Sequence, residues 1–148
     1  MNSDFKELLA DLCHFQVRFL VVGGYAVMYH SEPRFTKDLD LWIEPDPKNA
    51  ARLREALLKF GAWLSHMDVS DFTQLGVMFQ IGMPPVRVDF LTSVPGIEFP
   101  GCWERRDTVR IGEVEVPFLG LEDLITAKEQ AGRDQDLLDL KKLRRRSE

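Results

Sequence analysis

Hydrophobic and polar residues follow two different rhythms along this chain, and each rhythm predicts a different kind of element. In several stretches apolar residues recur every three to four positions, as they do on the buried side of an amphipathic helix. The clearest begins at Asp46-Pro47, a cap followed by proline at the first helical position, and ends at Gly61. The spacing predicts helices over residues 3–12, 25–30, 47–60, 121–131 and 134–143.

Other stretches are short, rich in β-branched or aromatic residues, or alternate between apolar and polar positions, as strands do. They predict strands over residues 17–22, 38–43, 77–81, 86–91, 108–111 and 113–118. The turn residues Gly82-Met83-Pro84-Pro85 and the glycine at 112 predict two antiparallel hairpins. Strands mix with helices throughout and no repeat or long linker divides the chain, so we expect one α/β (α+β) domain over residues 1–148, with a mixed β-sheet flanked by helices.

Composition narrows the function classes. The chain has 148 residues, enough for a real core, and a formal net charge of −5, which excludes a polybasic nucleic-acid binder although a local basic patch stays possible. No apolar run approaches the length of a membrane span, and the charged start Met-Asn-Ser-Asp-Phe-Lys-Glu is unlike a signal peptide. We therefore expect a cytoplasmic protein that does not enter a membrane.

The metal-binding and redox residue types are sparse. Cys13 and Cys102 have neither the spacing of a metal site nor a paired framework, which argues against a disulfide scaffold. The three histidines are scattered, so a zinc hydrolase has no support from the sequence.

Carboxylates are the candidate chemical groups. In the strand over 38–43, side chains alternate between faces, so Asp38 and Asp40 share one face while Leu39 and Leu41 point to the core. Asp89 adds a third carboxylate in the middle of another predicted strand. Like charges this close repel unless a cation lies between them, and oxygen ligands of this kind suit Mg²⁺. The alternatives are an ordinary exposed pair and a salt bridge between Asp89 and Arg87.

Gly23-Gly24 strengthens the case because it joins a buried strand to a helix. Glycines at such a junction let backbone N–H groups and the helix N-terminus approach a phosphate, although a Gly-Gly pair by itself is usually only a turn.

An apolar strand, Gly23-Gly24, then Asp38-Leu39-Asp40-Leu41 and a later strand carboxylate at Asp89 together resemble the signature of the nucleotidyltransferase superfamily, the DNA polymerase β-like fold. The resemblance implies that the glycines and the following helix hold a nucleoside triphosphate. It also implies that Asp38, Asp40 and Asp89 are catalytic and bind two Mg²⁺ ions, with Mn²⁺ as a substitute. In this family an acceptor hydroxyl attacks the α-phosphorus and expels pyrophosphate.

Within that superfamily, the run Arg34-Phe35-Thr36-Lys37-Asp38 and the small size look most like the minimal nucleotidyltransferases, including the toxins of toxin–antitoxin and abortive-infection systems. The resemblance implies an antitoxin partner. Residues 121–140 also look like the helical ending of those proteins, which carries a lysine and an Arg-x-x-Asp type of cluster.

Arg34 and Lys128 are the cations we expect near the triphosphate, because phosphates need charge-assisted donors besides metal ions. For Lys128 the alternative is a solvated helix residue paired with a nearby acid. The basic run over 141–146 is either a nucleic-acid contact or an ordinary helix C-terminus, which we favour. Trp42 shares the face of Asp38 and could border the nucleotide.

Several questions stay open from sequence. The acceptor is an RNA end, a protein hydroxyl or a small molecule. A non-catalytic relative that binds a nucleotide or a partner protein, and a metal-dependent phosphohydrolase or nuclease, are the competing classes. A homodimer is expected if Phe72, Met78 and Met83 stay unburied.

Overall fold

A computed structural model describes residues 1–62, 68–83 and 86–147 of the chain. Trp63, His66 and the predicted turn residues Pro84-Pro85 lie outside this part. The strands form one mixed six-stranded sheet in the order β3-β4-β2-β1-β6-β5. Their bounds are β1 Phe19–Val22, β2 Asp38–Ile43, β3 Met78–Met83, β4 Val86–Leu91, β5 Asp107–Ile111 and β6 Val114–Phe118.

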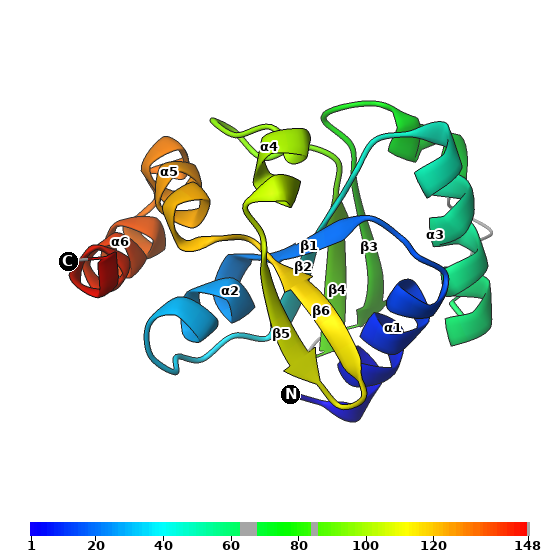
Figure 1. Cartoon of the computed structure of the whole chain (residues 1–148), viewed down its shortest axis with the longest axis horizontal. Helices are drawn as coiled ribbons and strands as arrows, with labels where there is room; N and C mark the ends of the chain where they lie inside the picture. The colour runs from blue at the N-terminus through cyan, green and yellow to red at the C-terminus, as the bar shows by residue number, and fades with distance from the viewer. Residues whose placement is uncertain (63–67, 84–85, 148) are drawn as a thin grey trace.

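Helices cover both faces of the sheet, with α1 and α3 on one side and α2, α5 and α6 on the other (Figure 1). Their bounds are α1 Ser3–His14, α2 Gly23–His30, α3 Pro47–Phe60, α4 Phe99–Glu104, α5 Leu121–Ala131 and α6 Asp134–Ser147, with a 3₁₀ helix, η1, at Val69–Thr73. The predicted mixed sheet flanked by helices is confirmed. No helix in the described ranges is both long and apolar enough to cross a bilayer.

Strand alternation separates the core from the polar side of the sheet. Leu39, Leu41 and Ile43 of β2 are completely buried and share one face of the sheet. Asp38, Asp40 and Trp42 take the opposite face. Helix α2 contacts β1 and β2, and α5 contacts α2 in turn. The burial of the leucines on one face of β2 therefore fixes the opposite face as the side of Asp38 and Asp40.

Two short helices were not predicted. The Pro/Gly-rich stretch before β5 contains α4, which buries Phe99 and Cys102 one turn apart and begins with Pro100 in its first turn. The 3₁₀ helix η1 buries Phe72, whose exposed fraction is 1% and whose ring packs edge-on against Phe79 and Phe90. The expectation that Phe72 is left for a dimer interface is therefore wrong.

Element ends differ from prediction by a few residues. Helix α2 begins at Gly23, two residues early, and α6 continues to Ser147 instead of ending at Leu143. Salt bridges Lys142–Glu32 and Arg144–Glu129, at 3.3 Å each, hold two of the terminal basic side chains against the fold. This agrees with an ordinary helix C-terminus for the basic run.

Candidate active site

The three predicted carboxylates lie on the middle strands of the sheet. Strands β2 and β4 are parallel neighbours, and their register pairs Asp40 with Asp89 and Asp38 with Arg87. Paired residues of adjacent strands point to the same face, so Asp40 and Asp89 stand side by side although they are far apart in the sequence. The sheet therefore brings together the carboxylates that the sequence could only suggest.

The environment of these carboxylates favours a cation. Burial raises the pKa of Asp40 to about 7, and repulsion from Asp89, a hydrogen bond with that side chain and repulsion from Asp38 act in the same direction. Lys128 acts in the opposite direction. Oδ1 of Asp89 is buried and accepts no hydrogen bond from any group in the described chain. This pair of carboxylates would gain from a positive partner that the folded chain supplies only in part.

Arg87 supplies some of that charge. Its Nη2 donates to Oδ2 of Asp38 at 2.8 Å and its Nε lies 3.4 Å from Oδ1 of Asp89. The predicted alternative of an Arg87–Asp89 salt bridge is thus present, together with a shorter bond to Asp38. With Arg87 between them, the three carboxylates do not converge, and no group of three or more acidic, histidine or cysteine side chains in the described ranges is arranged to hold a metal ion.

Gly23 is in direct contact with Asp40. Its φ of +65° is a left-handed conformation, and a Cβ built there would collide with the carboxylate of Asp40. Glycine is therefore required both by the backbone and by the close approach of the side chain. The peptide at the start of α2 lies against the carboxylate pair for this reason.

Gly23→Ala should disable the site, because the new methyl group would push the Asp40 carboxylate away from Asp89. Gly112→Ala is the matched control, since Gly112 has a φ of +64° but nothing within 4 Å of a built Cβ. We expect both variants to lose about 1 kcal/mol of unfolding free energy from backbone strain. Gly23→Ala should lose more because of the collision with Asp40, and it alone should lose nucleotide binding. Urea denaturation and nucleotide titration measure the two effects; equal nucleotide affinity in both variants would contradict the assignment.

Gly24 is crowded by the loop that precedes β2. A Cβ there would lie 2.6 Å from Oγ1 of Thr36 and 3.2 Å from Nη2 of Arg34. Thr36 Oγ1 donates to the carbonyl oxygen of Asp38 at 3.3 Å. The Gly-Gly junction thus lets this loop pack on the start of α2, and it brings Arg34 to the same edge of the site.

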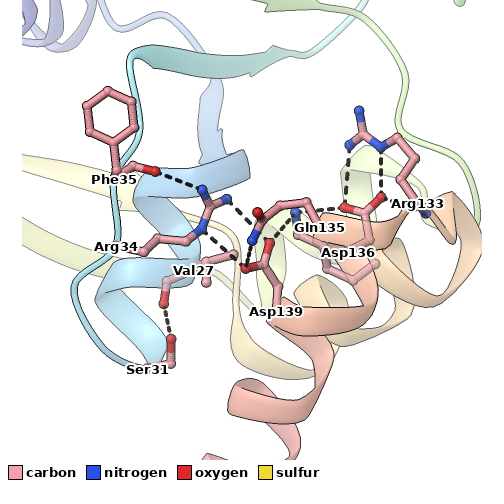
Figure 2. Close-up of polar contacts among 9 residues, drawn as sticks. Val27, Ser31, Arg34, Phe35, Arg133, Gln135, Asp136 and Asp139 are labelled. Atoms are coloured by element: carbon pink, nitrogen blue, oxygen red, sulfur yellow. Dashed lines mark hydrogen bonds and ion pairs between the residues drawn. The ribbon is translucent and has the colours of Figure 1, made fainter.

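Arg34 and Lys128, the two predicted phosphate cations, both bind Asp139 of α6. Arg34 Nε and Lys128 Nζ lie 3.2 Å and 3.1 Å from its carboxylate oxygens. Lys128 also lies 3.0 Å from Asp136, which binds Arg133 in turn. Figure 2 shows the contact of Arg34 with Asp139 and that of Arg133 with Asp136.

The two aspartates and the lysine of this network are buried, whereas Arg133 is exposed. Asp139 is fully buried and Asp136 is 1% exposed, and the side chain of Lys128 is 9% exposed. Burial would raise the pKa of Asp136, but hydrogen bonds from Arg133 and Lys128 hold it at about 2. Lys128 does pair with nearby acids, as the alternative interpretation expected, but it does so inside the protein.

A cavity of about 320 Å³ joins these features. Gly23, Asp40, Asp89, Lys128 and Arg133 all line it, and its remaining wall includes apolar residues of α5 and of the segment after β4. Asp38 and Arg34 do not line this cavity but line a separate recess of about 300 Å³, together with Lys37 and Arg87. Carboxylates, cations and a glycine-opened backbone thus meet in one space large enough for part of a nucleotide.

Sequence reasoning missed Arg87, Asp136 and Asp139 as members of this site. A signal was present for the two aspartates. Positions 136, 139, 140 and 143 have the spacing of one helix face, and Leu140 and Leu143 are buried on it. Two aspartates on an apolar stripe indicate buried ion pairs.

Trp42 does not border this cavity. It is 1% exposed and packs edge-on against Phe99 at 5.2 Å between ring centroids. The helix α4, which the sequence did not predict, supplies Phe99 and covers Trp42.

Comparison with known proteins decides the family. The family described as "Nucleotidyl transferase of unknown function (DUF2204)" matches residues 1–148, the whole chain. The chain belongs to this family. It is a member of the nucleotidyltransferase superfamily, as the glycine and aspartate pattern predicted, and nucleotidyl transfer is the activity class of that family.

Solved structures have the same fold. The lincosamide antibiotic adenylyltransferase LnuA, with lincomycin bound, is 12% identical with a TM-score of 0.61, over 97% of this chain and 96% of its own. A Thermotoga maritima protein described as a nucleotidyltransferase is 15% identical with a TM-score of 0.62, over 93% and 88%. ANT(2")-Ia, in complex with adenylyl-2"-tobramycin, is 13% identical with a TM-score of 0.61, over 94% and 84%. Among curated proteins, none matches this chain in sequence. At these identities the structural matches establish the fold alone.

Proposed function

We propose that this protein transfers a nucleoside monophosphate from a nucleoside triphosphate to a hydroxyl group of an acceptor. The observation that carries the proposal is the pairing of Asp40 with Asp89 beside the backbone of Gly23, at a cavity that also holds Lys128. The proposal treats residues 1–148 as a single nucleotidyltransferase-like domain.

The reaction forms one bond and breaks one. The acceptor oxygen bonds to the α-phosphorus, the bond from that phosphorus to the oxygen bridging to the β-phosphate breaks, and pyrophosphate leaves with the bonding electrons. The hydroxyl proton goes to a carboxylate of the Asp40–Asp89 pair, acidic groups that line the cavity. Lys128 and the N–H groups at the start of α2 orient the phosphates, and Arg34 donates to them from the edge of the site.

A divalent cation fits the donor set. Asp40 and Asp89 offer hard carboxylate oxygens, one of them without a hydrogen-bond partner in the described chain, and they are the residues that would hold the ion. Asp38 would join them only if its bond to Arg87 opened. Mg²⁺, or Mn²⁺ in its place, would neutralise the charge that develops on the phosphates. Arg87 stabilises the carboxylates in the absence of that ion, so metal binding and the Arg87 contacts compete.

Small molecules are among the acceptors to be tested, since the names of two structural neighbours refer to antibiotic adenylation. The predicted toxin role, antitoxin partner and homodimer stay predictions. Met78, 58% exposed at the sheet edge, is consistent with the dimer, and the side chain of Met83 lies outside the described part.

Transfer of α-labelled ATP, CTP, GTP and UTP, with Mg²⁺, to total RNA, lysate protein and a lysate small-molecule fraction tests the proposal. The control is the Asp38→Ala/Asp40→Ala double variant. We expect label in one acceptor fraction and an equal amount of pyrophosphate with the wild type only. Released inorganic phosphate without acceptor label would indicate a phosphohydrolase, and nucleotide binding without turnover in any fraction would indicate a binding-only relative.

A further inference from the structure

A second cavity of about 330 Å³ lies beside the candidate site. The proposed nucleotide binding does not use it. Its walls are mostly apolar. The rings of Trp42 and Phe99 meet edge-on in it, and Leu75, Ile97 and two prolines complete the apolar part. A cavity of this volume accommodates a small molecule.

The charged side chains that line the cavity are all acidic. Glu44 and Glu98 line it, and neither lysine nor arginine does. Glu44 binds Arg18 at 3.2 Å, outside the lining, while Glu98 is exposed at the rim and makes no ion pair within the described chain. Aromatic rings next to carboxylates attract ammonium groups, through the ring quadrupole and through charge. The lining would repel an anion.

The sheet register connects this cavity to the carboxylates. Trp42 and Leu91 form the next same-face pair after Asp40 and Asp89, two positions or about 7 Å further along the strands. Ser93 lines both cavities. A small molecule bound in the second cavity can therefore reach the proposed reaction centre with one end.

Each of the two cavities has one exposed hydrophobic side chain in its lining. Leu75, 73% exposed, lines the second cavity, and Met78, 58% exposed, lines the first. Exposed apolar residues grouped at a cavity mark a binding surface more often than chance exposure does. The indole N–H of Trp42 is buried and donates to no described group.

We propose that this cavity binds the acceptor of the transfer reaction, and that the acceptor is a small molecule with an apolar or aromatic body, a hydroxyl group and a protonated amine. The inference rests on the proposed function. The amine lies toward Glu98, the apolar body lies against the wall that Trp42 and Phe99 form, and the hydroxyl points along the strands toward Asp89. An RNA end is disfavoured, because its phosphates would face Glu44 and Glu98.

Three probes with one skeleton separate charge from shape: 2-amino-1-phenylethanol, 1-phenylethanol and mandelate, which carry charges of +1, 0 and −1. Each is titrated into ¹⁵N-labelled protein without nucleotide, and the indole N–H signal of Trp42, assigned by its loss in Trp42→Phe, reports binding. We expect the amine to bind about fivefold more tightly than the alcohol, and mandelate about fivefold more weakly, as for one exposed charge interaction.

Glu98→Gln should remove most of the preference for the amine over the alcohol and leave the affinity for 1-phenylethanol unchanged. Glu104→Gln is the matched control, because Glu104 is an exposed glutamate at the end of α4 outside the lining. Tighter binding of mandelate or of a short single-stranded RNA than of the amine, or no shift of the Trp42 signal with any probe, would overturn the proposal.

The transfer assay separates this inference from the proposed function. We expect 2-amino-1-phenylethanol to compete with the labelled acceptor fraction, and mandelate to compete much less. If transfer proceeds and the bound amine does not inhibit it, the cavity is not the acceptor site and the inference fails. If the amine binds but no transfer occurs to any fraction, the proposed function fails, and with it the acceptor role.

Discussion

Replacing Asp40 with asparagine should abolish nucleotidyl transfer and, in the absence of divalent cations at pH 8, make the protein more stable. Asp40 lies at the centre of the proposed chemistry, next to Asp89 and in contact with Gly23. Loss of a central catalytic group costs about a thousandfold or more in rate. The same side chain is costly to the fold, because it is held in a buried and negatively charged environment.

The pH dependence follows from the sign of the shift. Burial, with Asp89 and Asp38, raises the pKa of Asp40 from its ordinary value of 3.8 to about 7 in the folded protein. Between about pH 4 and pH 7 the folded chain keeps a proton that the unfolded chain has lost, so stability falls as pH rises and stays low above pH 7. The contribution amounts to at most about 4 kcal/mol, at about 1.4 kcal/mol for each pH unit.

Thermal unfolding of wild type and Asp40→Asn across pH 4 to 8 measures the effect. We expect the melting temperatures of the two proteins to be similar at pH 4, and that of the variant to be several degrees higher at pH 8. Mg²⁺ should raise the wild-type value at pH 8 more than that of Asp40→Asn. Asp71→Asn, at an exposed aspartate of η1, should leave both stability and transfer unchanged. A destabilised but active Asp40→Asn would contradict both the electrostatics and the assignment.

Strand alternation explains why the positions of Asp38 and Asp40 could be predicted from the sequence. A period of two puts Asp38 and Asp40 on one face and Leu39 and Leu41 in the core, and the burial of those leucines confirms it. The glycine pair was predicted from its position between a strand and a helix, and the structure adds the reason, which is that Asp40 occupies the space of a Cβ at Gly23.

The remainder depended on pairings that local sequence does not specify. The spacing of residues in the sequence does not tell which strand lies next to β2. The cross-strand pairs Asp38–Arg87 and Asp40–Asp89 are therefore seen only in the folded sheet. Helix α4 has too few residues for a periodic signal and contains residues typical of turns, yet it covers Trp42 and forms a wall of the second cavity. Short elements fixed by tertiary burial are the part of this fold that sequence rules do not reach.

Replacing Asp139 with alanine should destabilise the protein by about 3 to 5 kcal/mol, because it removes the anion from a buried ion-pair network. Asp139 binds Arg34 and Lys128 and also accepts a hydrogen bond from Gln135 at 2.9 Å (Figure 2). Arg34 would lose its carboxylate partner, and Lys128 would keep only Asp136. Because Arg34 packs against Gly24, the loop before β2 would also lose its attachment to α6, and nucleotide affinity should fall with stability.

Urea denaturation of Asp139→Ala, with Asp134→Ala as the control, measures the effect, since Asp134 is an exposed aspartate of the same helix. The control should stay within about 0.5 kcal/mol of wild type. Adding Lys128→Met to Asp139→Ala removes the under-paired lysine and should recover part of the lost free energy, with a coupling of about 1 kcal/mol or more between the two sites. Asp139→Ala with wild-type stability would mean that these buried charges do not hold α6 against the loop, and additive effects in the double variant would mean that Asp139 and Lys128 act separately.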